Sequence, residues 1–286
     1  MVTYIVYFLI VLSSVTQSAS TKAFNRKCSH SDVFNALKAS SAMIMFAIMA
    51  IPGFTFHLPT VLFGLAYGTA LCLSMYSGYK ALCLGPMALT SMLVSFSVVI
   101  PLFWGLTFGN EKLSLLQCIA FALLLVALIS TNADKLSAGS IRGTSYGIWL
   151  TFVGITFLCN GICSILQKQH QTLYPEAYSR EFMFFAMLLT SVIFTSVALA
   201  RRSFREIREC KGKSFGLLSG FSNGMANFLT LILAGFENAS ILFPVISAGT
   251  ILLALLCGRI VFKERLKINH YAALAFGLVS IVLLKL

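Results

Sequence analysis

Amide side chains recur at helical spacing inside two long apolar stretches of this chain. Asn160, Cys163 and Gln167 lie on one stripe of the first stretch, and Asn223 and Asn227 lie four residues apart in the second. An amide has several hydrogen bonds to satisfy, so in apolar surroundings it either joins another helix or faces a polar ligand. The chemistry that these residue types offer is therefore reversible binding of a small polar molecule.

Other small polar residues accompany the amides, and we predict that they face the same cavity. The candidates for substrate binding are Ser14, Gln17, Tyr67, Ser74, Ser91, Ser95, Asn160, Cys163, Gln167, Asn223, Asn227, Ser247 and Thr250. Each has an alternative role, because a Ser or Thr hydroxyl can bond to its own helix backbone and an amide can hold two helices together.

The sequence gives little support for an enzyme. No Asp or Glu lies well inside an apolar stretch, and His30, His57, His170 and His270 fall at or near stretch ends, where surface histidines are expected. An enzyme would need an embedded nucleophile, base or metal cluster. The eight Cys form no CxxC pair and fit small packing residues. We expect no catalytic residue, no metal site and no cofactor.

The composition indicates a membrane protein. Hydrophobic residues make up 58% of the 286, charged residues only 10%, and the mean hydropathy is +0.89. Soluble domains carry about 25% charged residues. The net charge of +12 is therefore interpreted as a signal of orientation and lipid contact, and not of nucleic-acid binding.

Apolar stretches long enough to cross a bilayer, about 20 residues each, fill the chain. An all-α membrane protein follows, because backbone groups in lipid must be paired internally. The ten predicted helices are 2–22, 32–52, 58–82, 87–108, 113–132, 144–167, 179–200, 212–236, 239–261 and 267–285. The first is expected to be a membrane helix and not a cleaved signal, because no basic residue precedes it.

An internal repeat divides the chain into 1–135 and 136–286. At one fixed offset, the matched pairs are Leu89 and Leu242, Leu102 and Leu255, Gly105 and Gly258, Glu111 and Glu264, and Leu113 and Leu266. Five helices per repeat is an odd number, so the two repeats must enter the membrane from opposite sides. Such inverted repeats place a substrate site at their interface, near the bilayer midplane.

Glycines and prolines inside the stretches are candidates for close packing or for hinges. Glycines four apart share a helix face and let backbones approach, and proline frees a carbonyl and can kink a helix. These residues are Gly64, Gly68, Pro101, Gly216, Gly220, Gly224 and Pro244.

The basic residues predict the orientation. Most of the 21 Lys and Arg fall at the first, third, fifth, seventh and ninth joints, which by the positive-inside rule face the cytoplasm. Both termini are then outside. The short joints favour the plasma membrane, and a bacterial inner membrane in particular.

The two turns Glu111-Lys112-Leu113 and Glu264-Arg265-Leu266, together with Ala81-Leu82, Gly85-Pro86 and Ala88 at an earlier joint, give the chain a family resemblance. It resembles the drug/metabolite transporter (DMT) superfamily, and within it the EamA-like transporters. The resemblance covers the whole chain. It implies a basket of helices around a central cavity lined by the first, third, fourth, sixth, eighth and ninth helices, with the fifth and tenth outside.

These observations predict a secondary transporter that exports a small neutral or zwitterionic, amino-acid-like metabolite by alternating access. The expected partners are the small-molecule substrate, the lipid bilayer and a coupling ion such as a proton, with the chain a monomer or homodimer. One alternative is a proton-coupled multidrug or cation exporter, although such a protein usually needs an embedded carboxylate. Another is a structural membrane protein that transports nothing.

Overall fold

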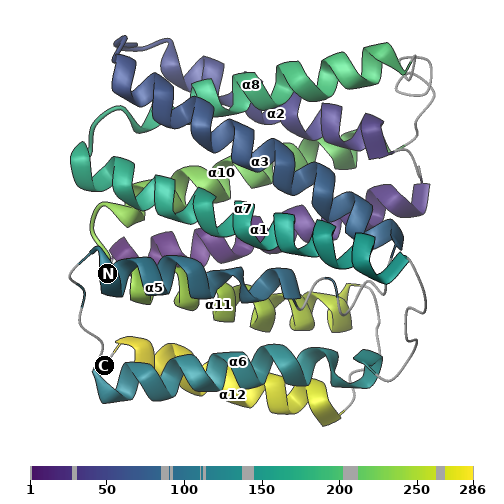
Figure 1. The fold of residues 1–286 in the computed structure, drawn as a ribbon, viewed down its shortest axis with the longest axis vertical. Coiled ribbons are helices and arrows are strands. Elements are labelled where there is room, and N and C mark those ends of the chain that lie inside the picture. Colours follow the sequence, from purple (N-terminus) through teal and green to yellow (C-terminus); the bar gives the residue numbers. More distant parts are fainter. Residues whose placement is uncertain are drawn as a thin grey trace. The chain divides into compact units, whose positions relative to one another are not determined.

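The computed structural model describes residues 2–27, 31–84, 90, 93–109, 111, 114–136, 145–201, 212–261 and 268–285. All regular secondary structure in these residues is helical (Figure 1). The helices are α1 Val2–Lys27, α2 Ser31–Ala50, α3 Leu58–Leu84, η1 Phe96–Val98, α5 Val99–Thr107, α6 Leu115–Leu136, α7 Ser145–Leu173, α8 Ser179–Ala200, α10 Lys213–Ala234, α11 Ala239–Ile260 and α12 Ile268–Lys285.

Seven of the described helices are long and apolar enough to cross a membrane. They are Thr3–Phe24, Asp32–Ala50, Leu58–Ala81, Tyr146–Leu173, Ser179–Ala200, Lys213–Ala234 and Ala239–Ile260. Three shorter apolar helices cover Leu93–Thr107, Leu115–Ser130 and Tyr271–Leu284. The predicted class, an all-α membrane protein, is confirmed. The count of ten spans stays a prediction.

Large apolar side chains cover the outside of these helices. Ile48, Leu62 and Phe103 are each about 60% exposed, at 62%, 59% and 58%. Such exposure would be costly in water and suits contact with lipid. The chain is therefore a membrane-embedded helical protein.

The described chain forms two compact units. One contains Met1–Cys72 and Leu166–Gly235, and the other contains Leu73–Ile165 and Phe236–Leu286. The helices α3 and α7 each contribute one part to either unit. Because each unit combines segments from both predicted repeats, the repeat itself stays a prediction from the sequence.

In the first unit, the helix α10 packs closely against α2 through its glycines. A Cβ at Gly216 would lie 3.2 Å from side-chain atoms of Leu37, and one at Gly224 would lie 2.8 Å from Cε of Met45. At Gly220, a Cβ would meet the carbonyl O of Lys38 and the hydroxyl of Ser41. The predicted glycine packing is thus present, with backbone against backbone.

The other predicted glycine pair packs on α8 in the same unit. A Cβ at Gly64 would lie 2.8 Å from the carbonyl O of Phe182, and one at Gly68 would lie 2.7 Å from that of Ala186. The two glycines let α3 approach the backbone of α8. Whether these contacts also serve as hinges stays a prediction.

In the second unit, α6 and α12 lie side by side (Figure 1). The Ser280 hydroxyl of α12 is fully buried and donates to the carbonyl O of Ala120 on α6 at 2.8 Å. Ala120 and Ala273 are also fully buried. Their small side chains permit the close approach of the two helices. The serine hydroxyl of the last helix therefore joins two helices.

The carboxylate of Glu111 caps the helix α11 in this unit. Its Oε1 accepts the backbone N–H of Ala239 at 2.8 Å, and its Oε2 accepts that of Ser240 at 2.9 Å. Asn238, the N-cap residue of α11, makes no capping side-chain bond. A negative charge at a helix N-terminus is favourable, so this turn residue anchors one helix end. Glu264, its predicted counterpart, lies outside the described residues.

The two prolines occupy different settings. Pro101 lies in the first turn of α5, directly after the 3-10 turn Phe96–Val98, and Pro244 lies inside α11. Proline lacks an N–H and crowds the carbonyl four residues earlier, so Pro101 accounts for the tighter turn that precedes it. Both are buried.

The helix α7 ends later than the sequence predicts. Its predicted end is residue 167, whereas the helix continues to Leu173. The next breaker is Pro175, in the short joint before α8. The continuation brings His170 and Gln171 inside the helix.

The glycine packing predicts a difference between two Gly→Ala variants. Gly220→Ala should lower the free energy of unfolding by about 1–3 kcal/mol, because the new methyl group meets the α2 backbone. Gly154→Ala meets nothing within 4 Å and should be neutral or stabilising by up to about 1 kcal/mol. Thermal unfolding of both proteins in one detergent measures the difference. Equal melting temperatures would contradict the close approach.

The Glu111 cap predicts that Glu111→Gln destabilises the protein by about 1–2 kcal/mol, because the amide offers one acceptor oxygen and no charge. Glu176→Gln, at an exposed position in the joint after α7, is the control and should change the melting temperature little. A Glu111→Gln protein as stable as this control would show that the capping bonds contribute nothing.

Candidate functional site

Three predicted residues meet in the first unit. The Tyr67 hydroxyl donates to Oδ1 of Asn227 at 2.8 Å, and Nε2 of Gln167 lies 3.4 Å from that hydroxyl and donates to the backbone carbonyl of Asn227 at 3.2 Å. Tyr67 comes from α3, Gln167 from α7 and Asn227 from α10. We call Tyr67, Gln167 and Asn227 the amide–phenol cluster.

The preceding turn of α10 adds a backbone group to this cluster through Asn223. Nδ2 of Asn227 donates to the carbonyl O of Asn223, one turn earlier, at 2.9 Å. Tyr67, Gln167 and Asn223 are 1%, 3% and 8% exposed. Asn227 is half-buried. Three predicted candidates from three helices therefore lie together in a largely buried setting.

The cluster is uncharged and its hydrogen bonds are interlocked. The phenol donates to one amide and accepts from another, so both amides are oriented by it. A ligand that enters must replace such a bond with one of its own, because an unpaired buried polar group costs about 1–3 kcal/mol. The arrangement suits a small molecule with hydrogen-bond donors and acceptors.

A second polar pair of helices lies in the other unit. The Ser74 hydroxyl of α3 donates to Oδ1 of Asn160 on α7 at 2.6 Å. One turn later on α3 and one turn earlier on α7, the hydroxyls of Ser77 and Thr156 are 2.8 Å apart. These four side chains tie α3 to α7, and they include two more of the predicted candidates.

The remaining candidates are not brought into either group. Ser14 donates to the carbonyl O of Ile10 in its own helix at 2.9 Å, which is the alternative role given above for a serine in a helix. Gln17 is half-buried, and its carbonyl O lies 3.4 Å from the Ser219 hydroxyl. Cys163 is buried, whereas Ser95, Ser247 and Thr250 are half-buried. Ser91 lies outside the described residues.

The interpretation of His170 as a surface histidine is wrong. Its side chain is fully buried, and its Nε2 lies 3.1 Å from the hydroxyl of Thr60, which is 2.9 Å from Nδ1 of His57. Since α7 continues past residue 167, His170 follows Gln167 by one turn on the same polar stripe. That spacing is the signal by which the sequence could have identified it.

Glu181 is also missing from the sequence-based candidates. It lies in the first turn of α8, is 5% exposed, and accepts from the N–H and the hydroxyl of Thr55 on Oε1, both at 3.3 Å. A carboxylate in the first turn of a helix is stabilised by the helix dipole. Its contacts hold the joint between α2 and α3 against α8.

No known protein family profile matches the sequence, and no curated protein resembles it in sequence. Its fold is shared with a protein whose crystal structure has been solved. The TM-score is 0.80 at 12% sequence identity, over 100% of this chain and 99% of that chain. At this identity the likeness concerns the fold alone.

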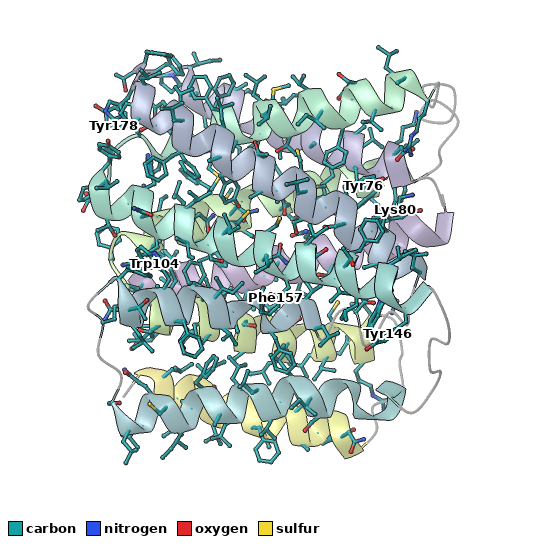
Figure 2. The ribbon with its side chains drawn as sticks, in the orientation of Figure 1. Tyr76, Lys80, Trp104, Tyr146, Phe157 and Tyr178 are labelled. Carbon is teal, nitrogen blue, oxygen red and sulfur yellow. The ribbon has the colours of Figure 1, made fainter. Side chains whose placement is uncertain are left out.

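The cluster geometry predicts that Tyr67→Phe destabilises the protein by about 1 kcal/mol, because one buried hydrogen bond is lost and an amide oxygen loses its donor. Tyr76→Phe, an exposed position on the same helix (Figure 2), is the matched control. Thermal unfolding compares the two. If both variants melted at the same temperature, the phenol would not hold the amides in place.

Proposed function

We propose that this protein is a secondary transporter of a small neutral or zwitterionic metabolite, such as an amino acid, and that it works as an exporter. The proposal rests on the amide–phenol cluster. It is a largely buried and uncharged set of hydrogen-bonding groups, contributed by three helices of a membrane-embedded protein. A bundle with a purely structural role does not need such a polar interior.

The chemistry of the cluster favours this substrate class. Amide and phenol groups donate and accept hydrogen bonds without demanding charge. A zwitterion's charged ends can be held by helix termini and carbonyl groups. A permanent cation would need an anionic partner at depth, and the described carboxylate nearest to this role, Glu181, already accepts two hydrogen bonds from Thr55.

Alternating access between two inverted repeats is the mechanism that we propose with it. The sequence repeat supports this mechanism, as does the resemblance to EamA-like members of the drug/metabolite transporter superfamily. In such a mechanism the substrate site faces each side of the membrane in turn. The close glycine contacts of α10 with α2 and of α3 with α8 are the surfaces along which we expect helices to shift.

A counterflow experiment tests the proposal independently of transport direction and driving force. Purified protein in liposomes loaded with a mixture of unlabelled neutral amino acids should accumulate the same amino acids, radiolabelled, from outside. Gln167→Leu should slow this exchange by about tenfold or more, since the lost bonds are worth about 1–3 kcal/mol.

Gln169→Leu is the matched control, because Gln169 is an exposed residue of the same helix, two positions away. It should exchange as fast as the unsubstituted protein. Equal rates for the two variants would remove the cluster from the substrate site. Absence of exchange with the unsubstituted protein would overturn the proposed substrate class and favour a structural membrane protein.

A further inference from the structure

A series of hydrogen bonds joins two histidines at the N-terminal end of α3. His57 Nδ1, the Thr60 hydroxyl and His170 Nε2 follow one another at 2.9 and 3.1 Å. Thr60 and His170 are fully buried, whereas His57 is partly exposed. The series therefore leads from the surface of the first unit into its interior.

The neighbouring amide fixes how hydrogens are arranged along this series. Nε2 of Gln171 lies 3.2 Å from Nδ1 of His170 and donates to the Ser179 hydroxyl at 2.9 Å. An amide NH₂ only donates, so Nδ1 of His170 accepts and its Nε2 carries the hydrogen. His170 then donates to Thr60, and the Thr60 hydroxyl has its own hydrogen to donate to Nδ1 of His57. Both rings are neutral in this arrangement.

The pair has room for one additional proton. A hydroxyl oxygen can accept two hydrogen bonds. If Thr60 turns its own hydrogen away, Nδ1 of His57 can take up a proton from water and donate to Thr60 beside His170. The proton comes from a hydronium ion, whose O–H bond breaks as the N–H bond forms, so one water molecule is released and the pair gains a single positive charge.

Among the described residues, no carboxylate forms a hydrogen bond with either histidine. The charged and titratable side chains that the structure describes at the end of α7, in the joint after it and in the first turn of α8 are Lys168, Tyr174, Glu176, Tyr178, Arg180 and Glu181. Those on α3 are Tyr67, Cys72, Tyr76, Tyr79 and Lys80. Lys168 and Arg180 bind backbone carbonyls, and Glu181 binds Thr55. A charge in such surroundings is costly until water or a carboxylate reaches it.

Two tyrosine rings pack against the ring of His57. Its ring stacks on Tyr178 at 4.5 Å between centroids and meets Tyr174 edge-on at 4.7 Å. Tyr178, labelled in Figure 2, and Glu176 have positive φ angles of 55° and 58°, a conformation that costs about 1–2 kcal/mol per residue. The joint thus holds its tyrosine on the histidine at the expense of backbone strain.

We propose that His57 and His170, bridged by Thr60, bind one proton between them, and that this proton is the coupling ion of the transport proposed above, on which this inference depends. Protonation then favours a different arrangement in which water reaches the pair, because a ligand shifts a protein toward the state that binds it better. The deprotonated pair favours the arrangement described here.

Two variants separate coupling from transport. Thr60→Val keeps the shape of Thr60 and removes the bridging hydroxyl, while Thr69→Val, at an exposed position of α3 whose hydroxyl bonds to Leu65 in its own helix, is the matched control. His170→Gln is the second test variant, because its amide can still donate to Thr60 but takes up no proton in this pH range.

In proteoliposomes, an imposed pH gradient should drive net accumulation of the radiolabelled amino acid mixture by the unsubstituted protein and by Thr69→Val. Thr60→Val and His170→Gln should keep counterflow exchange and lose this accumulation. Exchange by the unsubstituted protein without gradient-driven accumulation would overturn the coupling proposal and leave the proposed function intact.

Proton binding is also measured without any substrate. NMR of protein with ¹³C at histidine Cε1 follows each ring from about pH 5 to about pH 9, with the four histidines assigned by single substitutions. His57 and His170 should titrate together, and Thr60→Val should separate their curves. Curves unchanged by Thr60→Val would overturn the shared site, even if the amino acid mixture is not transported.

Discussion

Hydrocarbon offers no hydrogen-bond partner, so each polar group that these helices carry inward has to be satisfied by another part of the protein. In the first unit this constraint gathers Tyr67, Gln167 and Asn227 into one interlocked set. In the transport that we propose, the same constraint would make the set selective. A substrate that broke one of these bonds would have to return a donor or an acceptor of the same kind, which would exclude purely apolar molecules of similar size.

The constraint also explains how the helices adhere. Helices in lipid gain little from apolar burial against each other, so they rely on close backbone contact and on hydrogen bonds. The glycines of α10 bring it to the backbone of α2, where the Ser41 hydroxyl lies 3.0 Å from the carbonyl O of Leu217. In the second unit, Glu111 satisfies two N–H groups at the start of α11. Main-chain groups are the partners in both cases.

The sequence predicted the helical class, the glycine packing and the members of the amide–phenol cluster, because all three follow from the helical period. It did not predict which residues bond to each other. That depends on the register between α3, α7 and α10, which no single helix specifies. His170 was misinterpreted for a different reason. The predicted helix ended at residue 167. In the structure the helix and its polar stripe continue through His170 and Gln171, and the helix ends at Leu173, shortly before Pro175.

The two polar groups of the first unit share the end of α7. His170 follows Gln167 by three residues, which is about 4.5 Å along a helix axis. Gln167 bonds to the amide–phenol cluster, whereas His170 bonds to Thr60 at the start of α3. A helix is stiff over so short a distance, so a movement that hydrates His170 also moves the amide of Gln167. In the proposed mechanism, proton uptake and the geometry of the cluster are then linked by one turn of helix. The link does not need a longer pathway through the protein.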